Sequence, residues 1–123
     1  MSTKHIEVMK VAITEAEKAL KKGEVPIGAV LVADSNQVLA AEHNQTVTLN
    51  DPTAHAEILA LRSAAAKVGN YRLLNTTLYV TVEPCPMCMG AAIHARVSRL
   101  VFGPRDPKSV SYTHLTLPTT PYV

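Results

Sequence analysis

The chain has 123 residues and a mass of 13.2 kDa, enough for one compact domain around a single core and too little for two. Hydrophobic residues make up 47% and charged residues 18%, a balance that excludes disordered, collagen-like and coiled-coil chains. The net charge of +2 permits a polyanionic partner without indicating one.

The first third of the chain predicts a helix followed by a strand hairpin. Apolar residues recur every three or four positions over residues 2–22, which indicates one apolar face of an amphipathic helix. That face comprises Ile6, Met9, Ile13, Ala16 and Leu20. Gly23 ends the helix, and residues 26–32 form an apolar run of strand length whose predicted hairpin partner is 38–42. Residues 45–51 have no periodicity and are expected to be a loop.

The remaining elements are two helices that alternate with two strands. The first helix is predicted over residues 53–67, after a proline and capping side chains. A strand over 77–82 precedes the second helix at 83–96, and a further strand follows at 99–103. Because helices and strands alternate, we expect crossover connections and a mixed, largely parallel sheet in a three-layer α-β-α sandwich.

The composition changes abruptly at residue 109. Residues 109–123 contain no Lys, Arg, Asp or Glu and no helical periodicity. We expect them to be a non-native tail left by cloning or sequence assembly, with a native segment rich in threonine and proline as the alternative. The functional domain is then 1–108. Residues 110–117 could still pair along an exposed sheet edge, because their β-branched side chains suit a strand.

The two cysteines, Cys85 and Cys88, form a C-x-x-C pair. Such a pair indicates a metal or redox site in a reducing compartment rather than a disulfide framework. No apolar run approaches the roughly 18 residues of a membrane span, and the N-terminus lacks the pattern of a secretion signal. We therefore expect a cytoplasmic protein with no membrane partner.

An upstream histidine and glutamate, His55 and Glu57, favour a metal site over a redox site. The pattern H-x-E followed by P-C-x-x-C is the signature of zinc-dependent nucleobase deaminases. Zinc takes nitrogen and sulfur ligands in a tetrahedron, and a catalytic site leaves one position to water. His55, Cys85 and Cys88 fill three positions of one Zn²⁺ per chain. Glu57 is predicted to be the general acid/base that moves protons between that water, the base and departing ammonia.

Both halves of this motif are predicted at helix starts. Cys85 and Cys88 lie at the beginning of the second predicted helix, where unpaired amide hydrogens and the macrodipole favour the thiolate form. His55 and Glu57 lie in the first turn of the preceding helix, so two helix N-termini face one metal. A structural zinc site would normally supply four protein ligands, and no other cysteine is present. The pattern therefore favours a catalytic site.

Longer segments around these motifs resemble the bacterial tRNA-specific adenosine deaminases of the cytidine/deoxycytidylate deaminase superfamily. The similar segments are 50–57, 70–73, 77–88 and 102–106, and the likeness spans residues 1 to about 108. The resemblance implies a cytidine-deaminase-like fold, a homodimer, and conversion of adenosine to inosine at the wobble position of a tRNA anticodon loop. It also implies that the final strand and helices of the family, which bear residues for the tRNA, are missing.

Taken residue by residue, the resemblance implies that His55, Cys85 and Cys88 are the zinc ligands and that Glu57 is the proton shuttle. It also assigns substrate contacts to an asparagine, to the start of the first strand and to a loop aspartate. These residues are Asn44, Pro26, Ile27, Gly28, Ala29 and Asp106.

Two alternatives remain open at this point. Guanine deaminases and cytosine or cytidine deaminases share the zinc core, although residues 102–106 favour the tRNA enzyme. A non-catalytic, zinc-bound deaminase-like subunit would use the same ligands. Glu57 argues against that alternative, because an inactive partner has no need for a proton shuttle.

Overall fold

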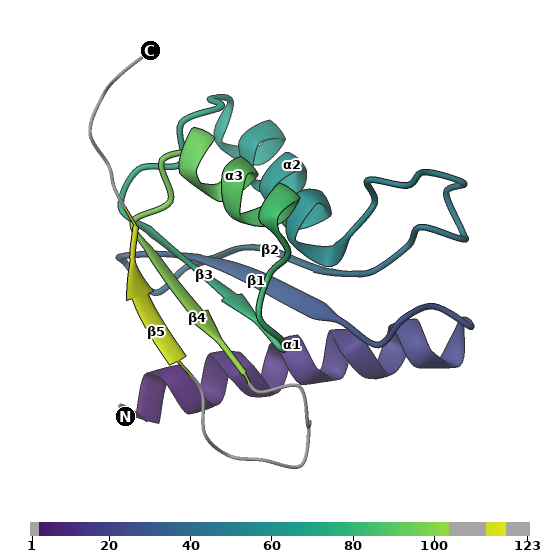
Figure 1. The fold of residues 1–123 in the computed structure, drawn as a ribbon. Coiled ribbons are helices and arrows are strands. Elements are labelled where there is room, and N and C mark those ends of the chain that lie inside the picture. Colours follow the sequence, from purple (N-terminus) through teal and green to yellow (C-terminus); the bar gives the residue numbers. More distant parts are fainter. Residues whose placement is uncertain (1–2, 104–112, 118–123) are drawn as a thin grey trace.

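The computed structural model describes residues 3–103 and 113–117. The helices are α1 (Thr3–Lys21), α2 (Ala56–Val68) and α3 (Pro86–His94). The strands are β1 (Gly28–Ala33), β2 (Val38–His43), β3 (Thr76–Val80), β4 (Arg99–Phe102) and β5 (Thr113–Thr116). They form one sheet in the order β2-β1-β3-β4-β5 (Figure 1). Among the described helices, none is long and apolar enough to cross a membrane.

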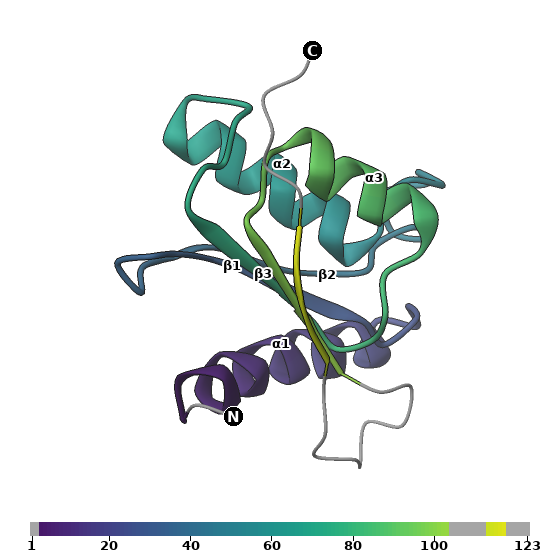
Figure 2. The ribbon, with the colours of Figure 1, turned by 60° about the vertical axis from the view of Figure 1, so that its left-hand side comes forward.

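The elements form three layers, as Figures 1 and 2 show from two sides. The helix α1 lies along one face of the sheet, and α2 and α3 lie side by side on the other face. Met9, Ala12 and Tyr79 belong to the core between α1 and the sheet. Ala60 and Leu78 belong to the larger core between the sheet and the outer helices. The prediction of a three-layer α-β-α sandwich is confirmed.

The sheet is mixed, but most of its strand pairs are antiparallel. The strands β2, β3 and β4 run in the same direction, as the alternation of helices and strands predicts. The hairpin, however, places β1 between β2 and β3, and β1 is antiparallel to both. Of the pairs between described strands, only β3 with β4 is parallel. The expectation of a largely parallel sheet is wrong for this reason.

The helix α1 packs on the sheet through small side chains. Ile6, Ile13 and Leu20, which were predicted to face the core, are 43%, 37% and 63% exposed. The buried apolar positions are Met9, Ala12, Ala16 and Ala19. A Cβ atom at Gly28 would lie 1.9 Å from the carbonyl oxygen of Ala12, so α1 and β1 approach backbone to backbone. Larger side chains do not fit between them, which corrects the predicted face.

The outer helices α2 and α3 start slightly later than predicted. His55 and Cys85 are the N-cap residues of these helices and have extended backbone angles, with φ and ψ of −71° and 152° and of −72° and 168°. His55 therefore precedes the first turn of α2 instead of lying in it. Gly69 ends α2 in the left-handed conformation, with φ 77°, as the sequence predicts.

The strand β5 extends the sheet at its edge. It pairs antiparallel with β4, and the buried Leu117 that follows it joins the core under α2 and α3. The pairing expected within residues 110–117 is confirmed for Thr113–Thr116. Asp106 lies outside the described residues, and the division of the chain at residue 108 stays a prediction.

Candidate metal centre

Three ligand-type side chains converge where the N-termini of α2 and α3 meet. The Nδ1 atom of His55 lies 3.7 Å from the Sγ atom of Cys85 and 3.5 Å from the Sγ atom of Cys88. The three ligand atoms all lie within 4.8 Å of one another, so this group could hold a metal ion. The spacing of the motif and the fold thus bring together the residues that the sequence predicts as ligands.

These separations suit a tetrahedral zinc ion. With a Zn–N distance of about 2.0–2.1 Å and a Zn–S distance of about 2.3 Å, tetrahedral angles place the nitrogen and sulfur atoms roughly 3.6 Å apart. The observed distances of 3.7 Å and 3.5 Å lie on either side of that value. Neither cysteine forms a disulfide, so both sulfurs can serve as ligands. The donor set therefore fits a zinc ion with three protein ligands.

The helix starts explain how these side chains reach the centre. Neither His55 nor Cys85 uses its side chain to cap its own helix, which leaves the imidazole and the thiol available to a metal. Pro86 occupies the first helical position of α3, where its missing amide hydrogen costs no helical hydrogen bond. Cys88 follows three residues after Cys85 and lies on the same side of the helix.

Glu57 lies beside the centre, in the first turn of α2. Its side chain is buried, and its Oε1 atom has no hydrogen-bond partner among the described residues. Burial raises the pKa of Glu57 above its ordinary value, against smaller opposing effects of its own backbone amide and of Cys88. A buried polar atom without a partner is costly, so this oxygen is placed to bond a group that the centre takes up.

Cys88 is the most deeply buried of the three ligand-type residues, with an exposed fraction of 1%. Burial raises the pKa of the Cys88 thiol well above its ordinary value, and the negative charge of Glu57 adds to this shift. Desolvation therefore opposes the effect of the helix N-terminus, which we expected to favour the thiolate. A bound cation deprotonates a thiol, so metal binding and loss of this proton are coupled.

Two of the predicted substrate-contacting segments lie next to each other. Asn44 follows β2, and its backbone N–H donates to the carbonyl oxygen of Ile27 at 3.1 Å. In this segment at the start of β1, Gly28 and Ala29 are buried while Pro26 is exposed. The fold thus places Asn44 against the strand start that the resemblance assigns to the base pocket.

Sequence reasoning missed one buried acidic residue in this region, Glu24. Its carboxylate lies in the turn between α1 and β1 and accepts hydrogen bonds from Val47 and Thr48 in the loop after β2. A glutamate directly after the helix-ending Gly23 is ordinarily exposed, because charged residues are rarely buried without partners. No signal in the sequence marks those partners.

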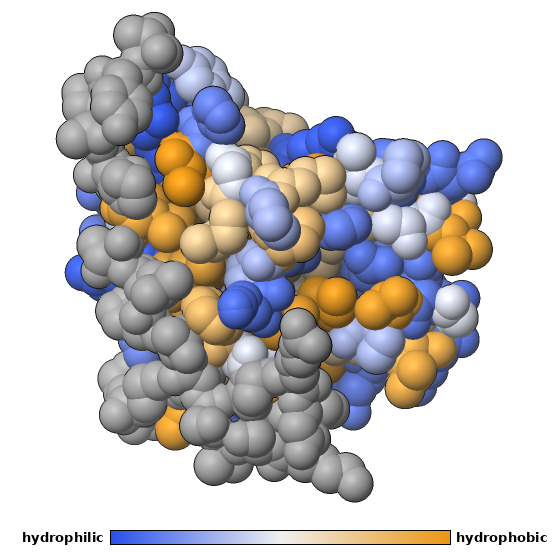
Figure 3. Space-filling view, in the orientation of Figure 1, coloured by the Kyte–Doolittle hydropathy of each residue, from blue (hydrophilic) through white to orange (hydrophobic). Residues whose placement is uncertain are grey.

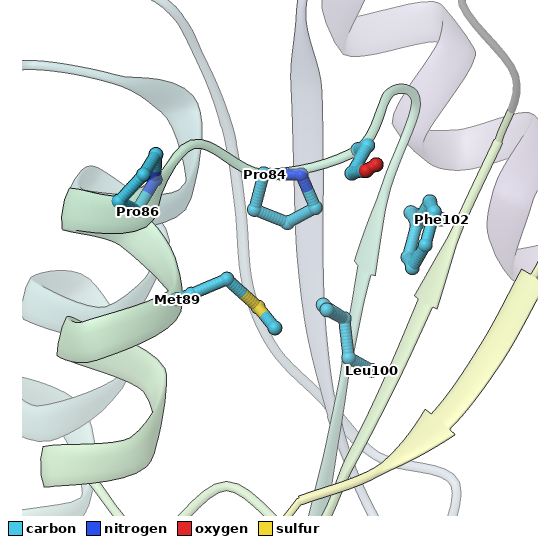
Figure 4. A pocket seen from close by; sticks show the side chains of 6 residues that line it. Pro84, Pro86, Met89, Leu100 and Phe102 are labelled. Carbon is cyan, nitrogen blue, oxygen red and sulfur yellow. The ribbon is translucent and has the colours of Figure 1, made fainter.

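A cavity of about 330 Å³ opens beside the connection from β3 to α3. Its lining residues are Glu83, Pro84, Pro86, Met89, Leu100 and Phe102 (Figure 4). Pro84 and Pro86 flank Cys85 in the chain, but neither the ligand-type residues nor Glu57 line the cavity. Glu83 is its one charged lining residue.

Known proteins resemble this chain in sequence and in fold. The family model for the cytidine and deoxycytidylate deaminase zinc-binding region matches residues 2–104. A tRNA-specific adenosine deaminase from Haemophilus influenzae is 52% identical over 103 residues, which are 84% of this chain and 60% of that protein. The chain spans about three fifths of the length of the curated relatives it matches.

Solved structures agree with this relationship. A chain from a study of A-to-I editing by tRNA:A34 deaminases at the wobble position of transfer RNA has a TM-score of 0.77 and 51% identity, covering 81% of this chain and 72% of that one. Guanine deaminase from Bacillus subtilis has a TM-score of 0.75 and 41% identity, covering 84% of this chain and 64% of that one. The region matched by the family model includes all residues of the metal centre, and the chain therefore belongs to the family of the cytidine and deoxycytidylate deaminase zinc-binding region.

Proposed function

We propose that the chain catalyses the zinc-dependent hydrolytic deamination of adenosine to inosine at the wobble position of a tRNA. One observation carries the chemistry: a buried carboxylate oxygen without a partner, from Glu57, lies beside three side chains spaced for zinc. The choice of substrate is supported by the 52% identity to a tRNA-specific adenosine deaminase.

In the proposed reaction, His55, Cys85 and Cys88 hold one zinc ion per chain. When bound, zinc lowers the pKa of a coordinated water and so supplies a nucleophile near neutral pH. Glu57 accepts a proton from the water and delivers a proton to the ring nitrogen beside the attacked carbon. Glu57 then takes up the second proton of the attacking water and transfers it to the departing amine. A C–N bond breaks, a C=O bond forms, and ammonia leaves.

The substrate is proposed to bind against the two neighbouring segments described above. The side-chain amide of Asn44 offers a donor and an acceptor to the nucleotide, and the start of β1 provides a wall of the base pocket. Asp106 is proposed to approach the flipped nucleotide and its neighbours. The partner is the anticodon loop of a tRNA.

We also propose, on the resemblance, that the protein is a homodimer. From the sequence patterns described above, we propose that it is cytoplasmic and that residues 109–123 are a non-native tail. Size-exclusion chromatography with light scattering measures the oligomeric state of the 123-residue chain. A monomer at micromolar concentration would contradict the dimer, and it would leave the proposed chemistry of the metal centre unaffected.

A second candidate is deamination of free guanine, because a guanine deaminase is 41% identical to this chain at a TM-score of 0.75. The test incubates the zinc-loaded chain separately with an anticodon stem-loop RNA, guanine and cytidine, and measures ammonia, inosine and zinc on the same sample. Inosine in the RNA with about one zinc per chain supports the proposed function. Ammonia from guanine or cytidine alone favours the corresponding deaminase, and zinc without any activity favours a non-catalytic subunit.

A further inference from the structure

Glu24 is a buried carboxylate that the proposed chemistry does not use. It is 4% exposed and lies in the turn between α1 and β1. Its Oε1 atom accepts a hydrogen bond from the backbone N–H of Val47 at 3.2 Å, and its Oε2 atom accepts bonds from the N–H and the hydroxyl of Thr48, both at 2.6 Å. All three donors belong to residues 44–55, here called the β2–α2 loop. One carboxylate thus fixes this loop to a distant turn.

The β2–α2 loop is also bonded within itself. The N–H of Gln45 donates to the carbonyl oxygen of Ala54 at 2.9 Å, and the N–H of Asp51 donates to that of Thr46 at 3.1 Å. These bonds close the base of the loop directly before the ligand-type residue His55. The loop projects beyond the N-terminus of α2 (Figure 1). We therefore treat it as one unit whose position depends on its outside attachment.

Thr46 connects this attachment with the proposed substrate pocket. Its Oγ1 atom accepts a hydrogen bond from the Nδ2 atom of Asn44 at 3.3 Å, and its hydroxyl also lowers the pKa of Glu24. On its other side, Asn44 is bonded through its backbone N–H to Ile27 at the start of β1. Glu24 precedes Ile27 by three residues. Glu24 therefore joins the two segments proposed to line the base pocket.

The loop and the turn carry exposed apolar side chains. Val47 and Leu49 on the loop are 73% and 50% exposed, and Val25 in the turn is 57% exposed. Figure 3 shows apolar side chains at the right-hand edge of the molecule, where the loop and the end of α1 lie. Apolar side chains held beside a pocket suit contact with unstacked nucleobases.

We propose that Glu24 is a positioning residue: by clamping the β2–α2 loop to the turn before β1, it holds Asn44 and the exposed apolar tip of the loop in the geometry that binds the substrate. The effect on the substrate rests on the proposed function, whereas the clamp itself is measured without activity.

The charge of Glu24 is central to the clamp. The hydroxyl of Thr48 contributes most to holding the pKa of Glu24 below its ordinary value; burial opposes this, and the amides of Thr48 and Val47 assist it. The carboxylate is therefore charged at neutral pH and accepts charge-assisted hydrogen bonds. Glutamine has nearly the same shape, but its NH₂ group is a donor and cannot accept the hydrogen bonds that the loop donates to the carboxylate. Glu24→Gln removes the clamp with the smallest change of volume.

Amide hydrogen exchange of Val47 and Thr48 in the zinc-loaded chain tests the clamp. In Glu24→Gln we expect exchange to accelerate roughly ten- to a hundredfold, the effect of losing charge-assisted hydrogen bonds. Thr48→Val, which removes the hydroxyl alone, should show a smaller increase, and Thr48→Ser none. Exchange within α2 and the zinc content should stay unchanged. Glu7→Gln, on the exposed side of α1, is the matched control.

The substrate arm compares KM and kcat on an anticodon stem-loop RNA. We expect Glu24→Gln to raise KM about tenfold and to change kcat by less than about threefold, because the clamp touches no reacting atom. A merely structural defect would lower the amount of active enzyme, and hence kcat, and would not move KM. Unchanged exchange in Glu24→Gln overturns the clamp, and faster exchange with unchanged KM overturns its effect on the substrate. If the parent chain deaminates no RNA, the proposed function fails, and hydrogen exchange alone decides whether Glu24 holds the loop.

Discussion

The Oε1 atom of Glu57 is buried and has no hydrogen-bond partner among the described residues. Glu57→Gln keeps the shape of the side chain and removes its capacity to carry a proton. We expect this variant to retain about one zinc per chain and to lose deamination activity at least a hundredfold, roughly the contribution of a positioned acid/base. Atomic absorption and ammonia release on one sample measure both quantities. Glu17→Gln on the exposed side of α1 is the control, and full activity of Glu57→Gln would remove the carboxylate from the mechanism.

A third buried carboxylate, that of Glu15 on α1, links this helix to β2. Its Oε2 atom lies 2.8 Å from the Nζ atom of Lys18, and its Oε1 atom lies 3.0 Å from the Nδ1 atom of His43. Burial raises the pKa of Glu15, but the hydrogen bonds of Lys18 and His43 outweigh it and hold the pKa below its ordinary value of 4.5. A lowered pKa stabilises the fold above the unfolded-state value, and this stability is lost as the pH falls through the folded-state value.

Glu15→Gln should therefore lower the free energy of unfolding by about 2 kcal/mol at pH 7, the scale of hydrogen bonds to a charged group. The difference from the parent chain should shrink as the pH falls below 4.5, because the parent carboxylate then becomes protonated. Urea unfolding of both chains over a series of pH values measures this trend. A difference that stays constant through the acidic range would contradict the assignment.

At the residue scale, the sequence identifies the metal centre and misses the buried carboxylates, for a physical reason. The ligand types and the spacing of Cys85 and Cys88 carry the chemistry directly, so the motif alone predicts which side chains meet. Glu15 bonds a histidine 28 residues away, and Glu24 bonds an amide 23 residues away. Such partners become neighbours only when the hairpin folds. The residue type of a glutamate alone does not indicate whether its side chain is buried or exposed.

At the scale of elements, the contact between α1 and β1 depends on Gly28. A Cβ atom there would lie 1.9 Å from the carbonyl oxygen of Ala12 and 2.8 Å from the backbone nitrogen of Ala16. We expect Gly28→Ala to lower the free energy of unfolding by about 3 kcal/mol or more, because the added methyl must push the helix from the sheet. Thermal and urea unfolding measure the loss.

Gly90 in α3 provides the matched control, because a Cβ atom there meets nothing within 4 Å. Alanine is the better helix former, so Gly90→Ala should stabilise the fold by roughly 0.5–1 kcal/mol. Equal changes of stability in the two variants would mean that the close approach of α1 and β1 does not constrain the fold.

The same contact explains why the apolar face of α1 was predicted only in part. Hydrophobic periodicity correctly indicates a helix, and it correctly includes Met9 and Ala16 in the core. It gives Ile6, Ile13 and Leu20 more weight than the alanines, because it scores hydrophobicity and contains no information on the distance to the neighbouring strand. Where the backbones of a helix and a strand approach this closely, only small side chains fit between them, so the size of a side chain decides whether it is buried.

At the scale of the whole molecule, the metal centre joins two separate parts of the chain. His55 precedes α2, whereas Cys85 and Cys88 belong to the start of α3, and β3 lies between these helices in the sequence. Zinc that binds only the folded chain stabilises it by mass action. We expect removal of zinc by a chelator to lower Tm by about 10 °C or more and restoration of zinc to reverse the change. Scanning calorimetry measures this shift. Cys88→Ser should melt like the chelated chain, and a Tm that zinc does not affect would exclude a metal at this centre.

The relative direction of paired strands is the feature of the whole fold that the sequence predicted least well. Alternating helices and strands give β2, β3 and β4 a common direction, and that prediction is confirmed. Whether the first hairpin lies at the edge of the sheet or contributes an internal strand depends on whether the second edge of β1 also pairs. Both faces of β1 are almost entirely buried, so its local pattern contains no alternation that marks an edge.

The internal place of β1 has a consequence for the newborn chain. The hairpin leaves the ribosome before residues 76–80, which complete its second ladder, emerge. At typical rates of translation the unpaired side of Gly28–Ala33 stays open for on the order of a few seconds. During that interval the unpaired N–H and C=O groups of this edge can pair with a strand of another chain. Binding of a chaperone, or early docking of α1, then determines whether the nascent chain avoids aggregation.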